Sequence, residues 1–108
     1  MTKIELFEAG LQEKAAVFKA LSHPARLAIL TYLAETKGCI SGDISDELPL
    51  SRTTVHQHLA ELKKVDLIKG EITGVKTKYC LNTEKISLLT ENLNAFLTEL
   101  KCSTDNTC

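Results

Sequence analysis

The chain has 108 residues, of which 44% are hydrophobic and 25% charged, and its formal net charge is −1. This length fits one domain with a small core, and a small core favours oligomerisation. No apolar run reaches the roughly 18 residues that a membrane-spanning helix needs, and the N-terminal stretch MTKIELFEAG has glutamates where a signal peptide has an apolar segment. We therefore expect a cytoplasmic protein.

Charge is distributed unevenly along the chain. Residues 51–82 hold six Lys/Arg and three Asp/Glu, a net charge of +3. Residues 1–50 hold five against seven and residues 83–108 two against four, so each flank has a net charge of −2. A basic middle segment between acidic flanks indicates a localised anionic partner such as a nucleic acid. The alternative is a solvated charged surface without a partner.

The N-terminal part has the sequence signals of two helices. Thr2 and Glu5 form a capping box, which predicts that a helix begins at residue 3, and Gly10 is expected to bend or break it. The helix that follows is expected to carry four apolar residues on one face: Leu11, Ala15, Phe18 and Leu21.

The motif SHPAR restarts the helical pattern. Ser22 is the expected N-cap, and Pro24 suits the first turn, where its missing N–H would have no partner anyway. The Lys37-Gly38 pair is expected to end this helix. Its expected buried stripe consists of Leu27, Leu30, Leu33 and Ala34.

A helix-turn-helix is predicted next. The stretch CISGDISDEL is expected to form a short helical piece capped by Ser41 or Asp43, and Pro49 marks the turn after it. Ser51 is expected to cap a longer helix that extends from about residue 52 to residue 65. A helix, a tight turn and a longer helix make up the helix-turn-helix motif.

The segments LIKGEI and VKTKYCL alternate apolar and polar residues around TG, which predicts a β-hairpin. A last helix is expected from Thr83, its N-cap, to about Lys101. Its apolar residues are spaced by three and four positions, which is typical of a dimerisation seam, and the alternative is an ordinary core-facing stripe. These residues are Ile86, Leu89, Leu93, Phe96 and Leu100.

The helix after Ser51 has one apolar and one polar face. Four residues are expected in the core: Val55, His58, Leu59 and Leu62. The outer residues are hydrogen-bonding or basic, which suits the base edges of a DNA major groove. They are Arg52, Thr53, His56, Gln57, Lys63 and Lys64.

Two further groups are expected to contact the DNA backbone. Ser51, Thr53 or Thr54 can hold a phosphate at the helix N-terminus, and Lys76 and Lys78 lie near the hairpin tip. The sequence HQH is no chelate, because residues i and i+2 of a helix point in different directions. His56 is expected to contact DNA, His58 to pack with a hydrogen bond, and His23 to have a local structural role.

Three segments resemble the ArsR/SmtB family of winged-helix repressors: FKALSHPARLAILTYL, SRTTVHQHLAELKKVDLI and GVKTKYCLN. The resemblance covers about residues 15–82. It implies a mainly α fold with a small β-hairpin wing, a winged helix-turn-helix. We assign residues 1–102 to this DNA-binding and dimerisation domain, and the small or polar residues of 103–108 predict a flexible, cysteine-bearing tail. The resemblance also implies a helix-mediated homodimer that binds a palindromic operator in double-stranded DNA and releases it when a metal or metalloid binds.

The sequence departs from the metal sites of that family. The positions that match the arsenic-binding cysteine pair are Ile40 and Gly42, with Cys39 beside them. The last helix, KISLLTENLNAFLTEL, has neither His nor Asp, so the family's zinc-type site is absent. A glycine-rich phosphate loop and an acid pair are also missing, so we expect no enzymatic activity.

The tail carries the remaining candidate site. Cys102 and Cys108 are separated by five small or polar residues, and two thiolates on a flexible link can bind one soft centre such as As(III) or Sb(III). Cys39 or Cys80 could supply a third ligand, although Cys39 is expected to be a buried apolar residue. Redox sensing through a Cys102–Cys108 disulfide and a tail without function are the alternatives. A disulfide framework is not expected, and DNA binding should need no cofactor.

Overall fold

The computed structural model describes residues 7–41, 47–71 and 78–105. Its helices are α1 (Ala9–Ala20), α2 (Pro24–Glu35), α3 (Arg52–Lys64) and α4 (Thr83–Asp105). Its strands are β1 (Cys39–Ser41), β2 (Ile68–Glu71) and β3 (Lys78–Leu81). The strands form one antiparallel sheet in the order β1-β3-β2. The fold is thus mainly α with a small sheet, as predicted.

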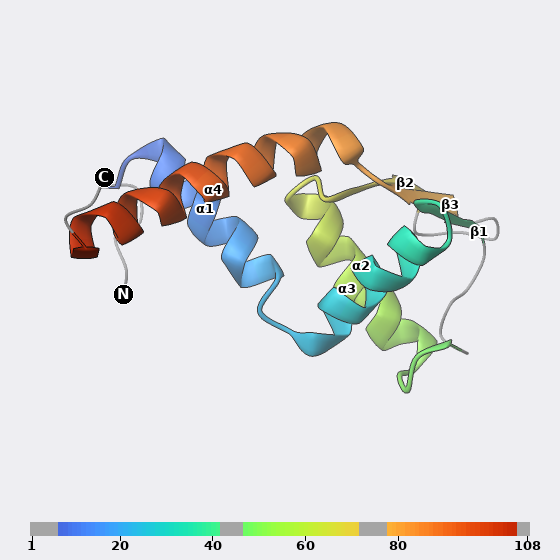
Figure 1. Cartoon of the computed structure of the whole chain (residues 1–108). Coiled ribbons are helices and arrows are strands. Elements are labelled where there is room, and N and C mark those ends of the chain that lie inside the picture. The colour runs from blue at the N-terminus through green and yellow to red at the C-terminus, as the bar shows by residue number, and fades with distance from the viewer. Residues whose placement is uncertain (1–6, 42–46, 72–77, 106–108) are drawn as a thin grey trace.

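The helices form two groups, which Figure 1 shows. Helices α2 and α3 lie together beside the sheet, while α4 extends away from the sheet and α1 lies along it. An ion pair between Glu13 and Lys85 (2.7 Å) joins α1 to the first turn of α4, and the ammonium group of Lys14 lies 5.9 Å from the ring centroid of Phe96. Helices α1 and α4 thus form one pair, and α2 and α3 form the other beside the sheet (Figure 1).

One hydrophobic core connects these elements. Every helix contributes to it, together with the segment that enters β2 and the central strand β3. Its buried members are Val17, Ile29, Leu33, Val55, Leu59, Leu62, Leu67, Ile68, Tyr79 and Leu89. Because α3 supplies three of these ten residues, its orientation is fixed by the same packing that holds the whole domain.

The structure corrects the expected start of α1 and the expected buried face of α2. Helix α1 begins at Ala9, so Gly10 lies in its first turn and does not interrupt it. Helix α2 buries Ile29 and Leu33, whereas Leu27 is 49% exposed and Ala34 is exposed. Apolar residues surround almost the whole of α2, so their spacing could not identify the inner face.

Two of the expected helix caps are wrong by one residue. His23 caps α2 by accepting a hydrogen bond at Nδ1 from the Ala25 N–H, while the Ser22 hydroxyl donates to the Lys19 carbonyl oxygen. At the start of α4, the Asn82 side-chain oxygen accepts from the Lys85 N–H at 3.4 Å, and Thr83 is already helical. In both cases two adjacent side chains could each accept the capping hydrogen bond, so the sequence alone did not identify which of them is the N-cap.

The sheet has a third strand that the sequence analysis missed. Lys37 and Gly38 have positive φ angles of 64° and 88°, and the Gly38 N–H donates to the Leu33 carbonyl oxygen at 2.7 Å. This turn sends residues 39–41 along β3 as a strand, where a helical piece capped by Ser41 was expected. Asp43 and Ile44, which belong to the same expectation, lie outside the described residues, as do Thr2 and Glu5.

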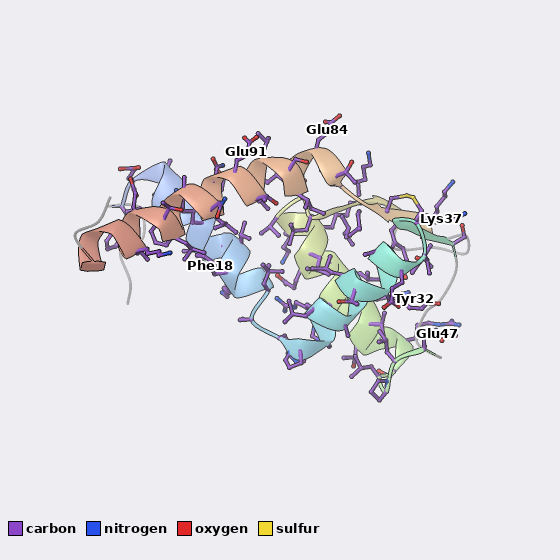
Figure 2. The ribbon with its side chains drawn as sticks, in the orientation of Figure 1. Phe18, Tyr32, Lys37, Glu47, Glu84 and Glu91 are labelled. Carbon is purple, nitrogen blue, oxygen red and sulfur yellow. A yellow bond between two sulfur atoms is a disulfide. The ribbon has the colours of Figure 1, made fainter. Side chains whose placement is uncertain are left out.

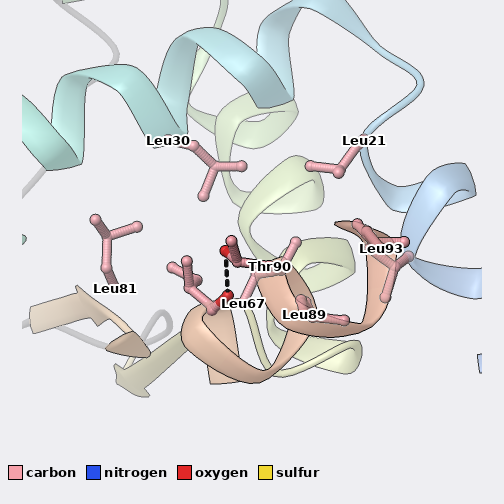
Figure 3. A pocket seen from close by; sticks show the side chains of 9 residues that line it. Leu21, Leu30, Leu67, Leu81, Leu89, Thr90 and Leu93 are labelled. Carbon is pink, nitrogen blue, oxygen red and sulfur yellow. Dashed lines mark hydrogen bonds between the residues drawn. The ribbon is translucent and has the colours of Figure 1, made fainter. Parts of the chain in front are cut away.

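The apolar seam of α4 is divided between two environments. Leu89 is buried, and Ile86 and Leu93 line an apolar pocket of about 330 Å³ with residues from α1 and α2 (Figure 3). The first half of the predicted seam is therefore an ordinary core-facing stripe, which was the alternative to a dimerisation seam. Farther along, Leu97 and Leu100 are 54% and 52% exposed, and Leu11 and Phe18 on α1 are exposed as well.

Helix α4 is longer than expected. It was predicted to end at about Lys101 but continues to Asp105, so Cys102 lies within the helix. The expected flexible tail of residues 103–108 therefore begins with three helical residues, and residues 106–108 lie outside the described part of the chain. Within the described residues, no helix is both long and apolar enough to cross a membrane.

Candidate nucleic-acid interface

The N-terminus of α3 is built by a local cap. Ser51 is extended, and its Oγ accepts a hydrogen bond from the Thr54 N–H at 3.2 Å. The same Ser51 hydroxyl donates to Thr54 Oγ1 at 3.0 Å. This cap satisfies one of the N–H groups that a helix start leaves unpaired, and the prediction of Ser51 as N-cap is confirmed.

Helix α3 has the two faces that its sequence predicted. Val55, His58, Leu59 and Leu62 are all buried. The opposite side carries Arg52, Thr53 and Gln57 as exposed residues, and His56 and Thr54 are half-buried. A hydrogen-bonding row therefore faces solvent along the first two turns of the helix, while the apolar row holds the helix in the domain.

A buried polar contact also fixes α3. The guanidinium Nε of Arg26 donates to His58 Nδ1 at 3.1 Å, and its Nη1 donates to the Ala20 carbonyl oxygen at 3.2 Å. The His23 ring lies 4.5 Å from the His58 ring, between centroids. Arg26 thus joins the end of α1, the start of α2 and the middle of α3. A hydrogen-bonded His58 was expected from the sequence, whereas its arginine partner was not.

The protonation state of His58 follows from its surroundings. Burial lowers the pKa of His58 below its usual value of 6.5, and the neighbouring His23 and Arg26 lower this pKa further. A neutral ring that accepts at Nδ1 carries its proton on Nε2. Protonation of His58 would remove the acceptor of Arg26 and place a second cation beside the guanidinium.

Two of the expected DNA-contacting lysines have partners within the chain. Lys63 Nζ donates to the Gly70 carbonyl oxygen at 2.7 Å, which ties the end of α3 to β2. Lys64 forms an exposed ion pair of 3.1 Å with Glu61, and this contact lowers the pKa of Glu61. Lys63 therefore has a structural role in attaching the sheet to α3, whatever it contacts in addition.

The sheet edge near the interface depends on one glycine. Gly70 has a φ of 116°, and a Cβ at this position would collide with the carbonyl oxygen of Lys78 on β3. Only glycine allows the two strands this close approach. Lys78 itself is exposed at the start of β3, while Lys76, which was predicted to lie at the same tip, is outside the described residues.

The cysteines are arranged differently from the expectation. Cys39 and Cys80 form a disulfide between β1 and β3, although no disulfide was expected. Cys39 is exposed and not buried. In this state neither residue can act as a third metalloid ligand, because both sulfurs are engaged.

The two tail cysteines are only partly described. The backbone of Cys102 lies in α4, and Cys108 lies outside the described residues. Among the described residues, no group of three His, Cys, Asp or Glu could hold a metal ion.

Comparison with known proteins agrees with this geometry. Residues 21–71 match a family described as a helix-turn-helix domain. The chain is 30% identical to the HTH-type transcriptional regulator YgaV of Escherichia coli, over 86% of this chain and 94% of that protein. It is 35% identical to the transcriptional repressor SdpR of Bacillus subtilis, over 75% of this chain and 86% of that protein.

A solved structure shows the same fold. The crystal structure of the ArsR family transcriptional regulator RHA00566 superposes with a TM-score of 0.66, at 19% identity, over 83% of this chain and 88% of that one. The chain belongs to the ArsR/SmtB family. It is a DNA-binding transcription regulator with a winged helix-turn-helix fold, and its family consists of regulators and not of enzymes.

Within this ArsR/SmtB regulator, the buried His58 makes stability depend on pH. Because the pKa of His58 is lower in the folded state, the unfolded chain binds more protons below about pH 6.5, and stability falls as the pH decreases through this window. Above that window both states are neutral at His58, and the effect vanishes. The lowered pKa values of Glu13 and Glu61 make stability depend on pH only below about 4.5, where the contribution of these two contacts is lost as the pH falls.

We predict that the melting temperature of the wild type falls more steeply between about pH 7.5 and pH 5.5 than that of His58→Gln. Glutamine keeps an acceptor for Arg26 but does not titrate. Thermal unfolding followed by circular dichroism measures both slopes. Equal slopes in the two proteins would show that His58 is not the group responsible.

Proposed function

We propose that this protein is a dimeric repressor that binds a palindromic operator through α3 and releases it when a trivalent arsenical or antimonite binds the thiols of Cys102 and Cys108. The DNA-binding part rests on one observation above all: the first two turns of α3 expose a polar, hydrogen-bonding face while the opposite face is buried in the core. Such a helix can enter a major groove without losing any core contact.

Each α3 residue has a role in this proposal. Arg52, Gln57, Thr53 and His56 contact base edges, since arginine matches guanine and glutamine matches adenine. The Ser51 hydroxyl donates to Thr54, so the Thr54 hydroxyl keeps its own proton for a phosphate oxygen beside the helix N-terminus. Lys78, with Lys76, contacts a phosphate from the wing, and Lys63 and Lys64 add positive charge at the end of α3.

The dimer in this proposal uses α1 and the distal half of α4. Both helices expose large apolar residues: Leu11 and Phe18 on α1, and Leu97 and Leu100 on α4. A small core makes burial of this surface against a second copy favourable. Two α3 helices related by a two-fold axis must be about 34 Å apart to reach successive major grooves. The dimer interface therefore sets the affinity for a palindromic operator.

The inducer is proposed from thiol chemistry. Thiolates prefer soft centres, and trivalent arsenic and antimony are soft. Cys102 lies on α4, the helix assigned to the dimer interface, so a ligand that joins Cys102 to Cys108 would act on that helix directly. A coupling of roughly 1–3 kcal/mol, typical of allosteric proteins, would weaken DNA binding by about 5- to 150-fold.

A second candidate input is thiol oxidation. The Cys39–Cys80 disulfide favours it, because this bond lies beside the predicted DNA-contacting residues of the wing.

The DNA contacts can be separated by two substitutions. We expect Gln57→Ala to lose about 1–3 kcal/mol for the preferred operator and to relax specificity at one base pair. We expect Lys78→Ala to weaken binding to all sequences and to reduce the salt slope by about 0.9. Fluorescence anisotropy at several salt concentrations measures both. Lys101→Ala, which removes a lysine from the far end of α4, is the matched control and should leave the slope unchanged; equal effects of all three variants would contradict the assignment.

The dimer can be tested at the exposed end of α4. We expect Leu97→Glu to give a monomer and to abolish tight operator binding, because a charge would be buried in the interface. Leu27→Glu, at a leucine that is 49% exposed on α2, should remain dimeric. Sedimentation velocity measures the oligomeric state. A monomeric wild type, or a dimeric Leu97→Glu variant, would show that this face is not the interface.

The inducer is tested by anisotropy on DNA from the protein's own promoter, under reducing conditions, with and without arsenite. We expect arsenite to weaken wild-type binding by about 5- to 150-fold. Cys102→Ser/Cys108→Ser should bind DNA equally well and ignore arsenite, while Cys39→Ser/Cys80→Ser should respond like the wild type. Normal release of the tail variant would eliminate the tail as the sensor.

A further inference from the structure

A second thiol pair lies in the sheet, where the strand register holds the two sulfurs together. Cys39 on β1 is directly opposite Cys80 on β3, and their Cα atoms are 4.0 Å apart. The neighbouring pair is joined by a hydrogen bond from the Leu81 N–H to the Gly38 carbonyl oxygen at 2.7 Å. Cys39 and Cys80 are therefore a non-hydrogen-bonded pair, the kind in which opposed side chains come closest.

The pair faces solvent. Cys39 is exposed and Cys80 is half-buried, whereas Tyr79, the next residue along β3, is buried in the core. Figure 2 shows the yellow sulfur–sulfur bond at the sheet, close to Lys37. A small reagent can thus reach the sulfurs without any opening of the domain.

A lysine stands in the same row of the sheet. Lys69 on β2 is directly opposite Cys80 on the other side of β3, so the three strands carry Cys39, Cys80 and Lys69 side by side. Directly opposed residues have Cβ atoms about 4.5–5.5 Å apart. The flexible Lys69 side chain can therefore bring its ammonium group to the Cys80 sulfur, and a cation there favours the thiolate of reduced Cys80, the nucleophilic form of cysteine.

The bond between the two cysteines encloses the DNA-reading part of the chain. They are separated by 41 positions, and the segment between them contains α3, β2 and the start of β3 with Lys78. Without the disulfide, the three-residue strand β1 is held by its backbone pairing with β3 and by the packing of Ile40 against the core. With the disulfide, both ends of this segment are fixed to each other.

We propose that Cys39 and Cys80 form a reversible oxidation site that reacts with hydroperoxides, and that closing the disulfide tightens DNA binding by fixing the α3–wing segment before it meets DNA. A segment that is already ordered loses less conformational freedom on binding. DNA is held in compartments where thiols are kept reduced, and disulfides that form there are usually transient and redox-sensing.

The reaction balances with the peroxide as oxidant. The Cys80 thiolate attacks one peroxide oxygen and breaks the O–O bond, which gives a sulfenic acid and, after proton transfer, one water. The Cys39 sulfur then attacks the sulfenic sulfur, the S–O bond breaks, and the hydroxide takes up the Cys39 proton as a second water. Two thiols lose two electrons in total to one peroxide. A dithiol such as dithiothreitol returns two electrons and two protons and becomes a disulfide itself.

This proposal requires DNA binding but not the arsenical input, and the test keeps the two apart. The chain has four cysteines, so Cys102→Ser/Cys108→Ser leaves only the sheet pair. This variant is oxidised with hydrogen peroxide, analysed by intact and peptide mass spectrometry, and titrated onto DNA from its own promoter by anisotropy. Dithiothreitol is then added and the titration is repeated.

We expect one Cys39–Cys80 link per chain, a Kd lower by roughly 5-fold or more, and full reversal by dithiothreitol. The melting temperature of the oxidised form should rise by about 10 °C or more, because the bond closes a long loop. Cys39→Ser in the same background should bind DNA like the reduced protein and should not respond to peroxide. Lys69→Met should slow disulfide formation, and Lys69→Arg should restore its rate.

The proposal is overturned if the peroxide-treated variant shows no Cys39–Cys80 link, or if the link forms and the Kd stays the same or rises. DNA binding that is absent in both redox states would instead contradict the assignment of the operator contacts. Loss of the arsenite response with an intact peroxide response would leave this site standing and identify the tail as the arsenical sensor.

Discussion

Packing against the core fixes the orientation of α3, and the position of its exposed face follows from that packing. Val55, Leu59 and Leu62 are buried by residues from the other helices and from the sheet. The exposed face of α3 is therefore presented at a fixed angle, and a major groove can accept it only at that angle. A helix that was held by its polar residues would lose its orientation when it exchanged those contacts for DNA.

A polar contact completes this hold. His58 is the one buried polar residue among those described, at 9% exposed, and it is paired with Arg26. The guanidinium of Arg26 also donates a hydrogen bond to the carbonyl oxygen of Ala20, the last residue of α1. The orientation of α3 is therefore coupled to α1, a helix assigned to the proposed dimer interface. In this way the two DNA-reading helices of a dimer would be positioned by contacts that reach from α3 to α1 within each chain. In the proposed dimer, a change at the interface would reach α3 through this contact.

Local signals were sufficient to predict α3 but not its neighbours. Ser51, the four buried positions and the polar face were all identified from the sequence, because capping and periodicity agree in this helix. Helix α2 was placed correctly, but only half of its expected buried stripe was right: Leu33 is buried and Leu30 packs against the core, whereas Leu27 and Ala34 are exposed. Its apolar residues lie on nearly all sides, so their spacing did not identify the inner face. The fold class came from the family resemblance, and the match with known regulators bears it out.

The features that could not be predicted from the sequence depend on pairing between segments far apart in the chain. Strand β1 has only three residues, and it exists because β3, about forty positions later, offers it a hydrogen-bonding edge. The disulfide follows from the same register, so Cys39 was expected in the core and is found at the surface. Arg26 was missed for a similar reason: its partner His58 is 32 positions away, and no local pattern connects them.

The central strand β3 connects the two outer strands of the sheet, β2 and β1. On one side it pairs with β2, which Lys63 attaches to the end of α3 through the Gly70 carbonyl. On the other side it pairs with β1, which follows directly from α2. Because β3 joins β2 to β1, a covalent bond at Cys80 acts on the strand that begins with Lys78. In the proposed dimer, a ligand at Cys102 would instead act on α4, the helix assigned to the interface between the two copies.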